Sequence, residues 1–383
     1  MAIDDARAVL ERAIRGRVFP AATAEVGDSP GVVWRDALGT LAFDTDTPAT
    51  LDTPFDLASL TKVIATTTVN MQLAESGALR LDDRVSTFFD EWRGADREAV
   101  TVRDLLEHAS GLPARLVDAA PSLRREFEHD ICALPLEYAP RTQSIYSDLG
   151  FILLGFLAAD RGGASLAALF DAIIDRAVRH ARGVRDDPGV RDDRGVRDDR
   201  GDRDDRGVRL QPDLLTFALL PDARRRAAPT MPMDTDPRRG RLLVGDVHDN
   251  YAAALGGAAG HAGLFGTAPG AGAFARIVLR AARGAASAPP PFSPARLAEF
   301  TTKSFVPGSS RALGWDTMLP TSSCGTRMSP AAFGHVGFTG TSLWIDPARD
   351  RYFVLLTNRA CGGGTLDDMR AVRRAFHDAL ADV

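Results

Sequence analysis

Short β-like runs lie near both ends of this chain, and a long helical stretch separates them. Near the start, residues 22–26 and 31–39 read ATAEV and GVVWRDALG around the hairpin signal GDSP. Near the end, TSLWIDPARDRYFVLLTNR contains two apolar runs around the turn DPARD. Amphipathic helical patterns lie outside the strands at both ends of the chain. We therefore expect an α/β (α+β) fold, with one antiparallel sheet built from both chain ends and helices packed on it.

The expected domain boundaries follow from this pattern. Residues 1–58 and 301–383 form a predicted sheet domain, and residues 59–300 form a mostly helical domain inserted between them. Within the insert, residues at about 183–209 repeat the six-letter unit VRDDRG with small changes. This repeat has too few apolar side chains to offset the entropy of ordering it, so we predict a flexible, solvated insertion.

Composition excludes several classes of function. The 383 residues are 45% hydrophobic and carry a formal net charge of −5, which does not favour a nucleic-acid partner. No apolar run approaches the roughly 18 residues of a membrane span. The N-terminus is acidic and helical rather than a secretory signal, and three scattered cysteines suit a reducing compartment. We expect a cytoplasmic protein, or a periplasmic one if the start is misassigned.

Lysine is rare in this chain, because only Lys62 and Lys303 accompany the arginines among 46 basic residues. Arginine cannot give up its proton in a protein, whereas a desolvated lysine can act as a base. In the sequence SLTK, Ser59 lies three residues before Lys62, which places both on one face of a helix. Ser59 would stand at the helix N-terminus, where developing negative charge is favoured. The pair is therefore a candidate serine nucleophile with an activating amine.

Two further motifs complete a resemblance. SIYSDLG places Tyr146 and Asp148 just before an apolar helix, and FGHVGFTGTS runs a glycine-rich edge into a predicted strand. With SLTK, this order resembles the serine β-lactamase and penicillin-binding-protein-like superfamily. LLEHASGLP, GGAAGHAGLFGTA and LGWD resemble its branch of class C β-lactamases, D-Ala carboxypeptidases and esterases. The resemblance implies a β-lactamase/transpeptidase-like fold, with the active site between the sheet and the helical insert.

The resemblance also implies roles for individual residues. Ser59 would attack a carbonyl and form an acyl-enzyme, while Lys62 takes or relays its proton. Tyr146 would protonate the leaving group and then activate water. Its ordinary pKa of about 10 makes it a poor base unless Lys62 lowers that value, so the two form one coupled unit. The backbone N–H groups of Ser59 and Phe338 would hold the oxyanion, and Gly337 would let substrate approach the strand edge.

The second and third motifs depart from the family pattern. Asp148 replaces an asparagine and His335 replaces a lysine, and both positions normally help to receive substrate. An ionised Asp148 would repel a carboxylate, and neutral His335 would attract one weakly. The changes favour an uncharged ester or amide, so we predict esterase-like hydrolysis. Asp148 could instead pair with Lys62 or His335, and Arg359 could supply a replacement cation, so β-lactamase or D-Ala-D-Ala carboxypeptidase-type activity on a lactam or peptide is the alternative.

Other constellations remain open at this point. His248 and His261 with Asp246 and Asp249 could form a metal cluster, although we expect no metal or organic cofactor. A triad of Ser59, His335 and Asp148 would leave the rare Lys62 without a task. A module that is acylated once and acts as a sensor or binding protein is a second alternative, and turnover would distinguish it from an enzyme. The sequence does not indicate the oligomeric state.

Overall fold

The computed structural model describes residues 2–116, 121–181, 214–234, 236–285 and 288–383. The main sheet has six strands in the order β2-β1-β9-β8-β7-β6, and all neighbouring pairs are antiparallel. Its strands are β1 (Ala21–Gly27), β2 (Val32–Gly39), β6 (Asp316–Thr317), β7 (Phe333–Val336), β8 (Ser342–Asp346) and β9 (Arg351–Thr357). The prediction of one antiparallel sheet from both chain ends is confirmed.

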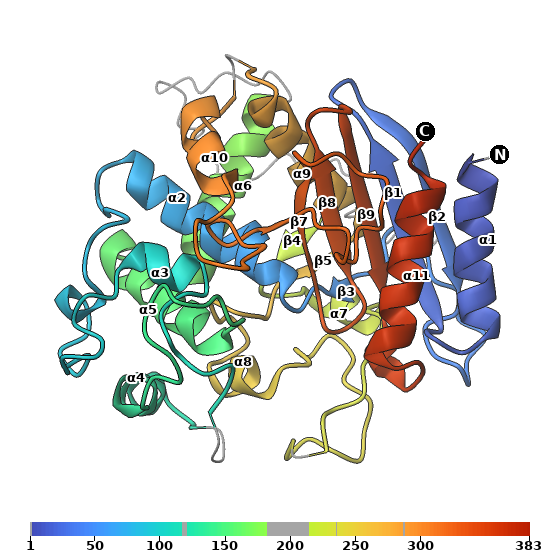
Figure 1. Cartoon of the computed structure of the whole chain (residues 1–383). Coiled ribbons are helices and arrows are strands. Elements are labelled where there is room, and N and C mark those ends of the chain that lie inside the picture. Colours follow the sequence, from blue (N-terminus) through green and yellow to red (C-terminus); the bar gives the residue numbers. More distant parts are fainter. Residues whose placement is uncertain (1, 117–120, 182–213, 235, 286–287) are drawn as a thin grey trace, which may run out of the picture.

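Helices cover both faces of this sheet (Figure 1). On one face lie α1 (Ala2–Arg15) and α11 (Leu366–Ala379), which pack against each other. On the other face α9 (Ala268–Ala282) contacts β1, β8 and β9. Because both faces are covered, every residue of β1 is buried, including polar ones.

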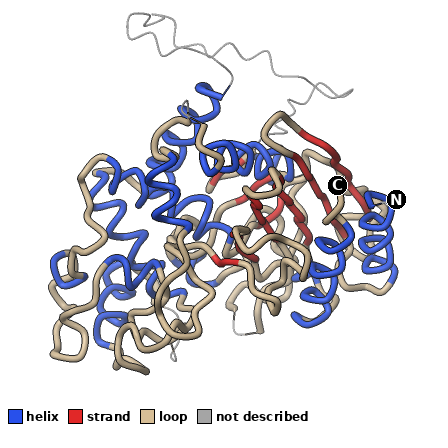
Figure 2. The backbone as a smooth tube through the Cα atoms, turned by 45° about the horizontal axis from the view of Figure 1, so that its top comes forward, coloured by secondary structure: helices blue, strands red, loops and turns tan. Residues whose placement is uncertain are grey.

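Most of the remaining helices form a second layer of structure beside the sheet (Figure 2). These elements are η1 (Lys62–Thr67, a π-helix), α2 (Thr68–Glu75), η2 (Val85–Thr87), α3 (Val102–Leu106), α4 (Arg124–Ala133), α5 (Asp148–Gly162), α6 (Leu166–Ala181), α8 (Asn250–Ala254) and α10 (Pro294–Thr301). The short helices α7 (Pro221–Arg225) and η3 (Arg359–Cys361) lie outside this layer, and η3 directly follows β9. The apolar helix α5 packs against α2, α3 and α6 and is buried over most of its length. It forms the centre of this helical part.

A small three-stranded sheet connects the helical part to the segment that carries Ser59. It has the order β3-β5-β4, from β3 (Phe55–Asp56), β5 (Phe265–Gly266) and β4 (Leu215–Thr216). The division into domains at residues 58 and 301 stays a prediction. The repeat predicted at about 183–209 lies outside the described residues.

No single helix in the described ranges is long and apolar enough to cross a membrane. The helices Asp148–Gly162 and Leu166–Ala177 meet that length and composition test only as a bent pair, with 73° between them.

Candidate active site

Ser59 begins a helix immediately after β3, on a tight turn. The residue before it, Ala58, has a φ of +47°, a left-handed conformation that a non-glycine residue rarely adopts. The buried carboxylate of Asp56 supports this turn, since Oδ1 accepts the Ala58 N–H at 2.8 Å and Oδ2 accepts the His248 N–H at 2.6 Å. Burial raises the pKa of Asp56 to about 6. The turn presents Ser59 at the helix start, as the sequence predicts.

Lys62 is fully buried, and all three of its N–H donors have acceptors. Nζ donates to Ser59 Oγ at 3.1 Å, to Asp148 Oδ1 at 2.8 Å and to the carbonyl of His261 at 2.9 Å. Burial alone would lower the pKa of Lys62, but Asp148 and then Tyr146 more than offset it and raise the pKa. Lys62 is therefore an ammonium in the resting protein.

Tyr146 donates its hydroxyl hydrogen to Ser59 Oγ across 2.7 Å. Its ring lies below Lys62 Nζ, 4.8 Å from the ring centroid, and against the ring of His108. Lys62 acts to lower the pKa of Tyr146, but this attraction does not decide the net direction. Burial of the phenol outweighs the attraction of Lys62 and raises the pKa. In the resting site the Tyr146 phenol and the Lys62 ammonium thus both donate hydrogen bonds to Oγ of Ser59.

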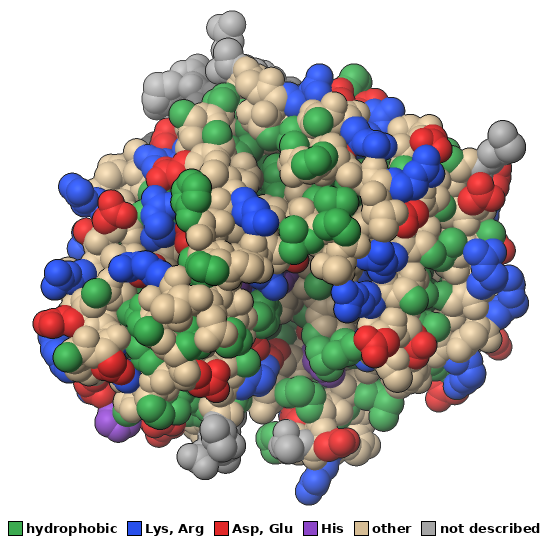
Figure 3. Space-filling view, viewed as in Figure 1, with side chains coloured by type: hydrophobic (Ala, Val, Ile, Leu, Met, Phe, Trp, Pro, Cys, Tyr) green, Lys and Arg blue, Asp and Glu red, His purple; other side chains and the backbone are tan. Residues whose placement is uncertain are grey.

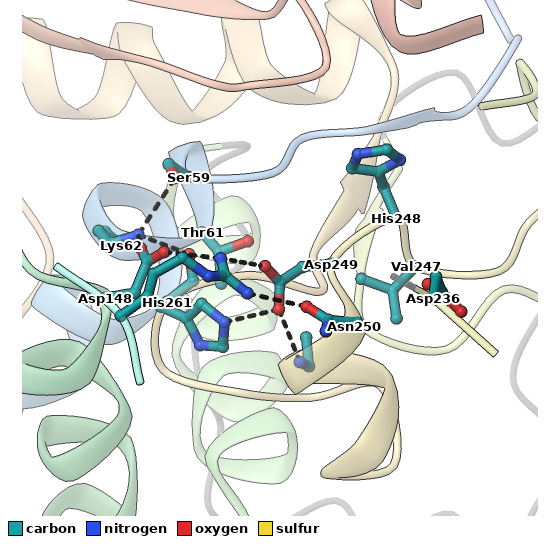
Figure 4. A network of polar contacts seen from close by, with 12 residues as sticks. Ser59, Thr61, Lys62, Asp148, Asp236, Val247, His248, Asp249, Asn250 and His261 are labelled. Atoms are coloured by element: carbon teal, nitrogen blue, oxygen red, sulfur yellow. Dashed lines mark hydrogen bonds and ion pairs between the residues drawn. The ribbon is translucent and has the colours of Figure 1, made fainter. Parts of the chain in front are cut away.

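Asp148 belongs to a network of buried charges (Figure 4). Its second oxygen, Oδ2, accepts from Arg115 at 3.0 Å, and Arg115 also donates to Asp249 at 2.9 Å and to Asn250 at 2.8 Å. His261 donates from Nε2 to Asp249 Oδ1 at 2.8 Å. Burial opposes ionisation of Asp148, yet the attraction of Lys62 and His261 lowers its pKa. Both oxygens of Asp148 are therefore committed to cations of the protein.

The segment that follows β7 lies against the turn before Ser59. A Cβ on Gly337 would lie 2.6 Å from the carbonyl oxygen of Leu57 and 3.3 Å from Cβ of Ala58, so only glycine permits this approach. Thr339 Oγ1 donates to the carbonyl of Asp56 at 2.7 Å. The residues just before Ser59 and the segment that follows β7 are therefore in direct contact.

The two proposed oxyanion donors are free. In the described ranges, the N–H groups of Ser59 and Phe338 have no hydrogen-bond acceptor. Phe338 is 46% exposed, and its ring stacks on the ring of His248. Within the described residues, Arg359 makes no hydrogen bond to Asp148 or His335. It donates instead to the carbonyl of Phe338, from Nη2 at 2.7 Å and from Nε at 3.2 Å. Its position stabilises the loop rather than presenting a cation to the cleft.

His335 is buried beside Tyr146, with ring centroids 6.0 Å apart. Burial and then the cations Arg311 and Lys62 hold its pKa well below the usual value, so the imidazole is neutral at pH 7. Nδ1 donates to the carbonyl of Val336 at 2.8 Å, and Nε2 accepts from Arg311 at 3.5 Å. This geometry, with Asp148 bound to Lys62, does not form the alternative triad.

Arg311 is a second cation that the motifs did not reveal. Its guanidinium lies 5.4 Å from the Tyr146 ring centroid and is 20% exposed, with Asp316 at a distance of 3.9 Å. Arg115 and Arg311 were missed because an arginine outside a motif carries no signal in a chain rich in arginine, and Asp249 was named only as a possible metal ligand. The alternative of a metal cluster finds no support, since no group of three or more His, Cys, Asp or Glu within the described ranges could hold a metal ion.

The space-filling view shows a hollow between the helical part and the sheet (Figure 3). Charged side chains of both signs and apolar side chains surround it, without a patch of one charge.

A family model described as β-lactamase matches residues 7–376. The chain belongs to the β-lactamase family. This is a family of serine hydrolases, so the resemblance inferred from the three motifs is confirmed. An Escherichia coli (strain K12) protein described as "Putative D-alanyl-D-alanine carboxypeptidase" is 28% identical over 341 residues, which cover 84% of this chain and 72% of that protein.

Solved structures of the β-lactamase/transpeptidase fold match the whole β-lactamase-family chain. The hydrolase EstCE1, described as having promiscuous acyltransferase activity, has a TM-score of 0.71 at 18% identity and covers 99% of this chain and 98% of its own. A class C β-lactamase from Rhodobacter sphaeroides also has a TM-score of 0.71, at 19% identity, covering 98% of each chain. At these identities the likeness shows the fold, which confirms the predicted fold class.

Proposed function

We propose that this chain is a hydrolase that forms an acyl-enzyme on Ser59. The observation that carries the proposal is the position of Ser59 Oγ, which lies 3.1 Å from Lys62 Nζ and 2.7 Å from the Tyr146 hydroxyl. Ser59 attacks the substrate carbonyl and gives up its proton to the Lys62–Tyr146 unit. Tyr146 then donates a proton to the leaving group, and water releases the acyl group.

The resting unit must first lose one proton. An ammonium and a phenol together hold no site that can accept the proton of Ser59, so the reactive form is the one in which Lys62 or Tyr146 is deprotonated. Because the pKa of each group is raised, that form is scarce at neutral pH. It becomes more abundant as pH rises. We infer that activity increases from neutral into alkaline pH.

The proposed substrate is a small uncharged ester or amide. The cations Lys62 and Arg115 are neutralised by Asp148 and Asp249, and His335 is neutral. The residues of the second and third motifs therefore offer no free positive charge to a substrate carboxylate. The fold that this chain shares with the hydrolase EstCE1 is compatible with this choice.

Arg311 favours a second candidate, a β-lactam or a D-Ala-terminated peptide. Its guanidinium stands beside Tyr146 and His335, and its carboxylate neighbour Asp316 is 3.9 Å away. A partly exposed arginine can receive a carboxylate in two parallel hydrogen bonds. In this case Arg311 would replace the lysine that the third motif lacks.

The deciding measurement compares kcat/KM for a short-chain p-nitrophenyl ester and a chromogenic cephalosporin, with Ser59→Ala as the blank. Faster Ser59-dependent ester turnover supports the uncharged substrate, and comparable or faster lactam turnover supports the second candidate. A single equivalent of released chromophore followed by no turnover with either substrate would support the sensor alternative instead.

A further inference from the structure

Arg373 of α11 is a buried cation without a buried anion beside it. The side chain is 5% exposed, and within the described ranges its hydrogen-bond acceptors are backbone carbonyls rather than carboxylates. Burial, and then the like charge of Arg359, lower its pKa to about 9, so it still carries its charge at neutral pH. A buried charge without a counter-ion lowers the stability of the folded protein. We therefore asked what its hydrogen bonds contribute to the site.

The guanidinium of Arg373 donates to two backbone carbonyls of the turn between β7 and β8. Nη2 of Arg373 donates to the carbonyl of Gly337 at 2.7 Å and to the carbonyl of Thr341 at 2.9 Å. Nη2 of Arg359 donates to the next carbonyl along the chain, that of Phe338, at 2.7 Å. Two arginines from the C-terminal segment therefore hold two consecutive carbonyl groups at the end of β7.

The carbonyl of Gly337 and the N–H of Phe338 belong to the same peptide group. A peptide group is planar, and in the trans form found here its C=O and N–H point in opposite directions. A donor fixed at the Gly337 oxygen consequently fixes the direction of the Phe338 N–H. The close contact of Gly337 with Leu57 and Ala58 places this peptide beside Ser59.

We propose that Arg373 is a positioning residue for the oxyanion hole, which holds the Phe338 N–H in its productive direction and places a positive charge behind it. This inference rests on the proposed acyl-enzyme function at Ser59. When the tetrahedral intermediate forms, its negative oxygen accepts from the Phe338 N–H. Arg373 polarises that N–H through the peptide group and favours the developing charge without touching substrate.

The neighbouring residue on α11 provides a matched control. Arg374 also uses its guanidinium to hold two loop carbonyls, those of Pro320 and Ser322, at 3.1 and 2.7 Å. Those carbonyls do not belong to the peptide that follows Gly337. Arg373→Met and Arg374→Met thus each remove two hydrogen bonds to loop carbonyls, and only the first removes one from the proposed oxyanion peptide.

The experiment measures kcat and KM for a p-nitrophenyl ester, and the rate at which a fluorophosphonate modifies Ser59, by mass spectrometry of the intact protein. We expect Arg373→Met to lower kcat and the fluorophosphonate rate by about ten- to a hundredfold, a smaller loss than removal of an oxyanion donor itself. KM should change less than threefold, roughly, because ground-state binding is not involved. Arg374→Met should alter neither rate by more than about twofold.

A second pair of variants serves if Arg373→Met does not fold. Arg373→Lys keeps a charged donor, and Arg373→Gln keeps a neutral donor of hydrogen bonds. We expect Lys to retain a rate within about fivefold of the wild type and Gln to lose about tenfold or more, since the charge behind the peptide is the missing part. Equal rates for Lys and Gln would contradict the electrostatic role.

The outcomes separate the two proposals. A wild-type protein that neither turns over ester nor reacts with the fluorophosphonate at Ser59 refutes the proposed function, and the inference falls with it. A reactive wild type with equal losses in Arg373→Met and Arg374→Met overturns the inference alone. A loss confined to Arg373→Met, in kcat rather than KM, supports it.

Discussion

Nζ of Lys62 and Oδ1 of Asp148 lie 2.8 Å apart, with the lysine fully buried. Asp148 stands where the second motif of the family has an asparagine, which would bring no charge to Lys62. The carboxylate keeps Lys62 protonated and leaves less of its attraction for the Tyr146 phenol. The activity of this site should therefore depend on pH through the pair rather than through either residue alone.

Replacing Lys62 by arginine should lower kcat/KM for the ester at least a hundredfold, roughly the contribution of a general base. Arginine keeps the charge, but its bulky guanidinium does not fit the three acceptors around Nζ and cannot lose a proton. The exposed Lys303→Arg is the control, and we expect it to retain wild-type turnover. Wild-type turnover by Lys62→Arg would refute the argument from lysine rarity.

Asp148→Asn should shift the pH profile of kcat/KM toward lower pH. Removing the carboxylate takes away the attraction that raises the pKa of Lys62, so the deprotonated unit appears at lower pH. Because one partner of a buried pair is lost, the free energy of unfolding should also fall by about 3 kcal/mol. Denaturant unfolding at pH 7 and a pH series of ester hydrolysis check both effects. An unshifted profile would mean that Asp148 does not control the protonation state of Lys62 and Tyr146.

Arg311→Gln tests the choice between substrates. If Arg311 receives a carboxylate, this variant should lose about tenfold or more in kcat/KM for the cephalosporin and less than about threefold for the neutral ester. The comparison is made with both substrates on the same preparation. Equal losses on both would show that Arg311 acts on His335 and Tyr146 rather than on a substrate charge.

Asp56 should give an acid limb to kcat at about pH 6. Its ionised form accepts both the Ala58 and the His248 N–H groups, whereas protonation converts one oxygen into a donor and weakens the turn before Ser59. Because its pKa is raised above 3.8, ionisation of Asp56 costs stability, and that cost disappears as pH falls below 6. Activity and this contribution to stability thus change in opposite directions. Asp56→Asn should abolish the limb, while Asp346→Asn, at another buried aspartate that accepts a backbone N–H, should retain it.

Buried histidines should make the fold sensitive to acid. The pKa values of His108, His248, His335 and His377 are lowered mainly by burial, to about 4 for His248 and about 3 for His377. The contribution of each neutral imidazole to stability is complete above pH 6.5 and is lost as pH falls toward the pKa of the folded state. For His248 and His377 the loss at pH 5 is roughly 2 kcal/mol each. Denaturant unfolding from pH 7 to pH 5 measures the loss.

His377→Gln should reduce the slope of stability against pH, and the exposed His129→Gln serves as its control. A free energy of unfolding that is constant from pH 7 to pH 5 would contradict this assignment.

The parts of the site that are close in sequence were predictable. Ser59 and Lys62 are three residues apart, and a helix brings them together without knowledge of the rest of the fold. Tyr146 and the β7 edge were placed by the resemblance of their motifs. Arg115 and Arg311 were not predictable, because nearly every cation of this chain is an arginine and no local pattern marks the two that reach the site. The raised pKa of Tyr146 depends on burial, which the sequence does not give.

Both chain termini lie at the same end of the paired helices α1 and α11 (Figure 1). Joining them by a short linker and opening the chain between α6 and β4 would give a circular permutant. Strands β6 to β9 would then be followed directly by β1 and β2, without the helical region between them, and the segment with Phe338 would precede Ser59. The order in which the two halves of the active site emerge during synthesis would then be reversed, without any change in the folded site.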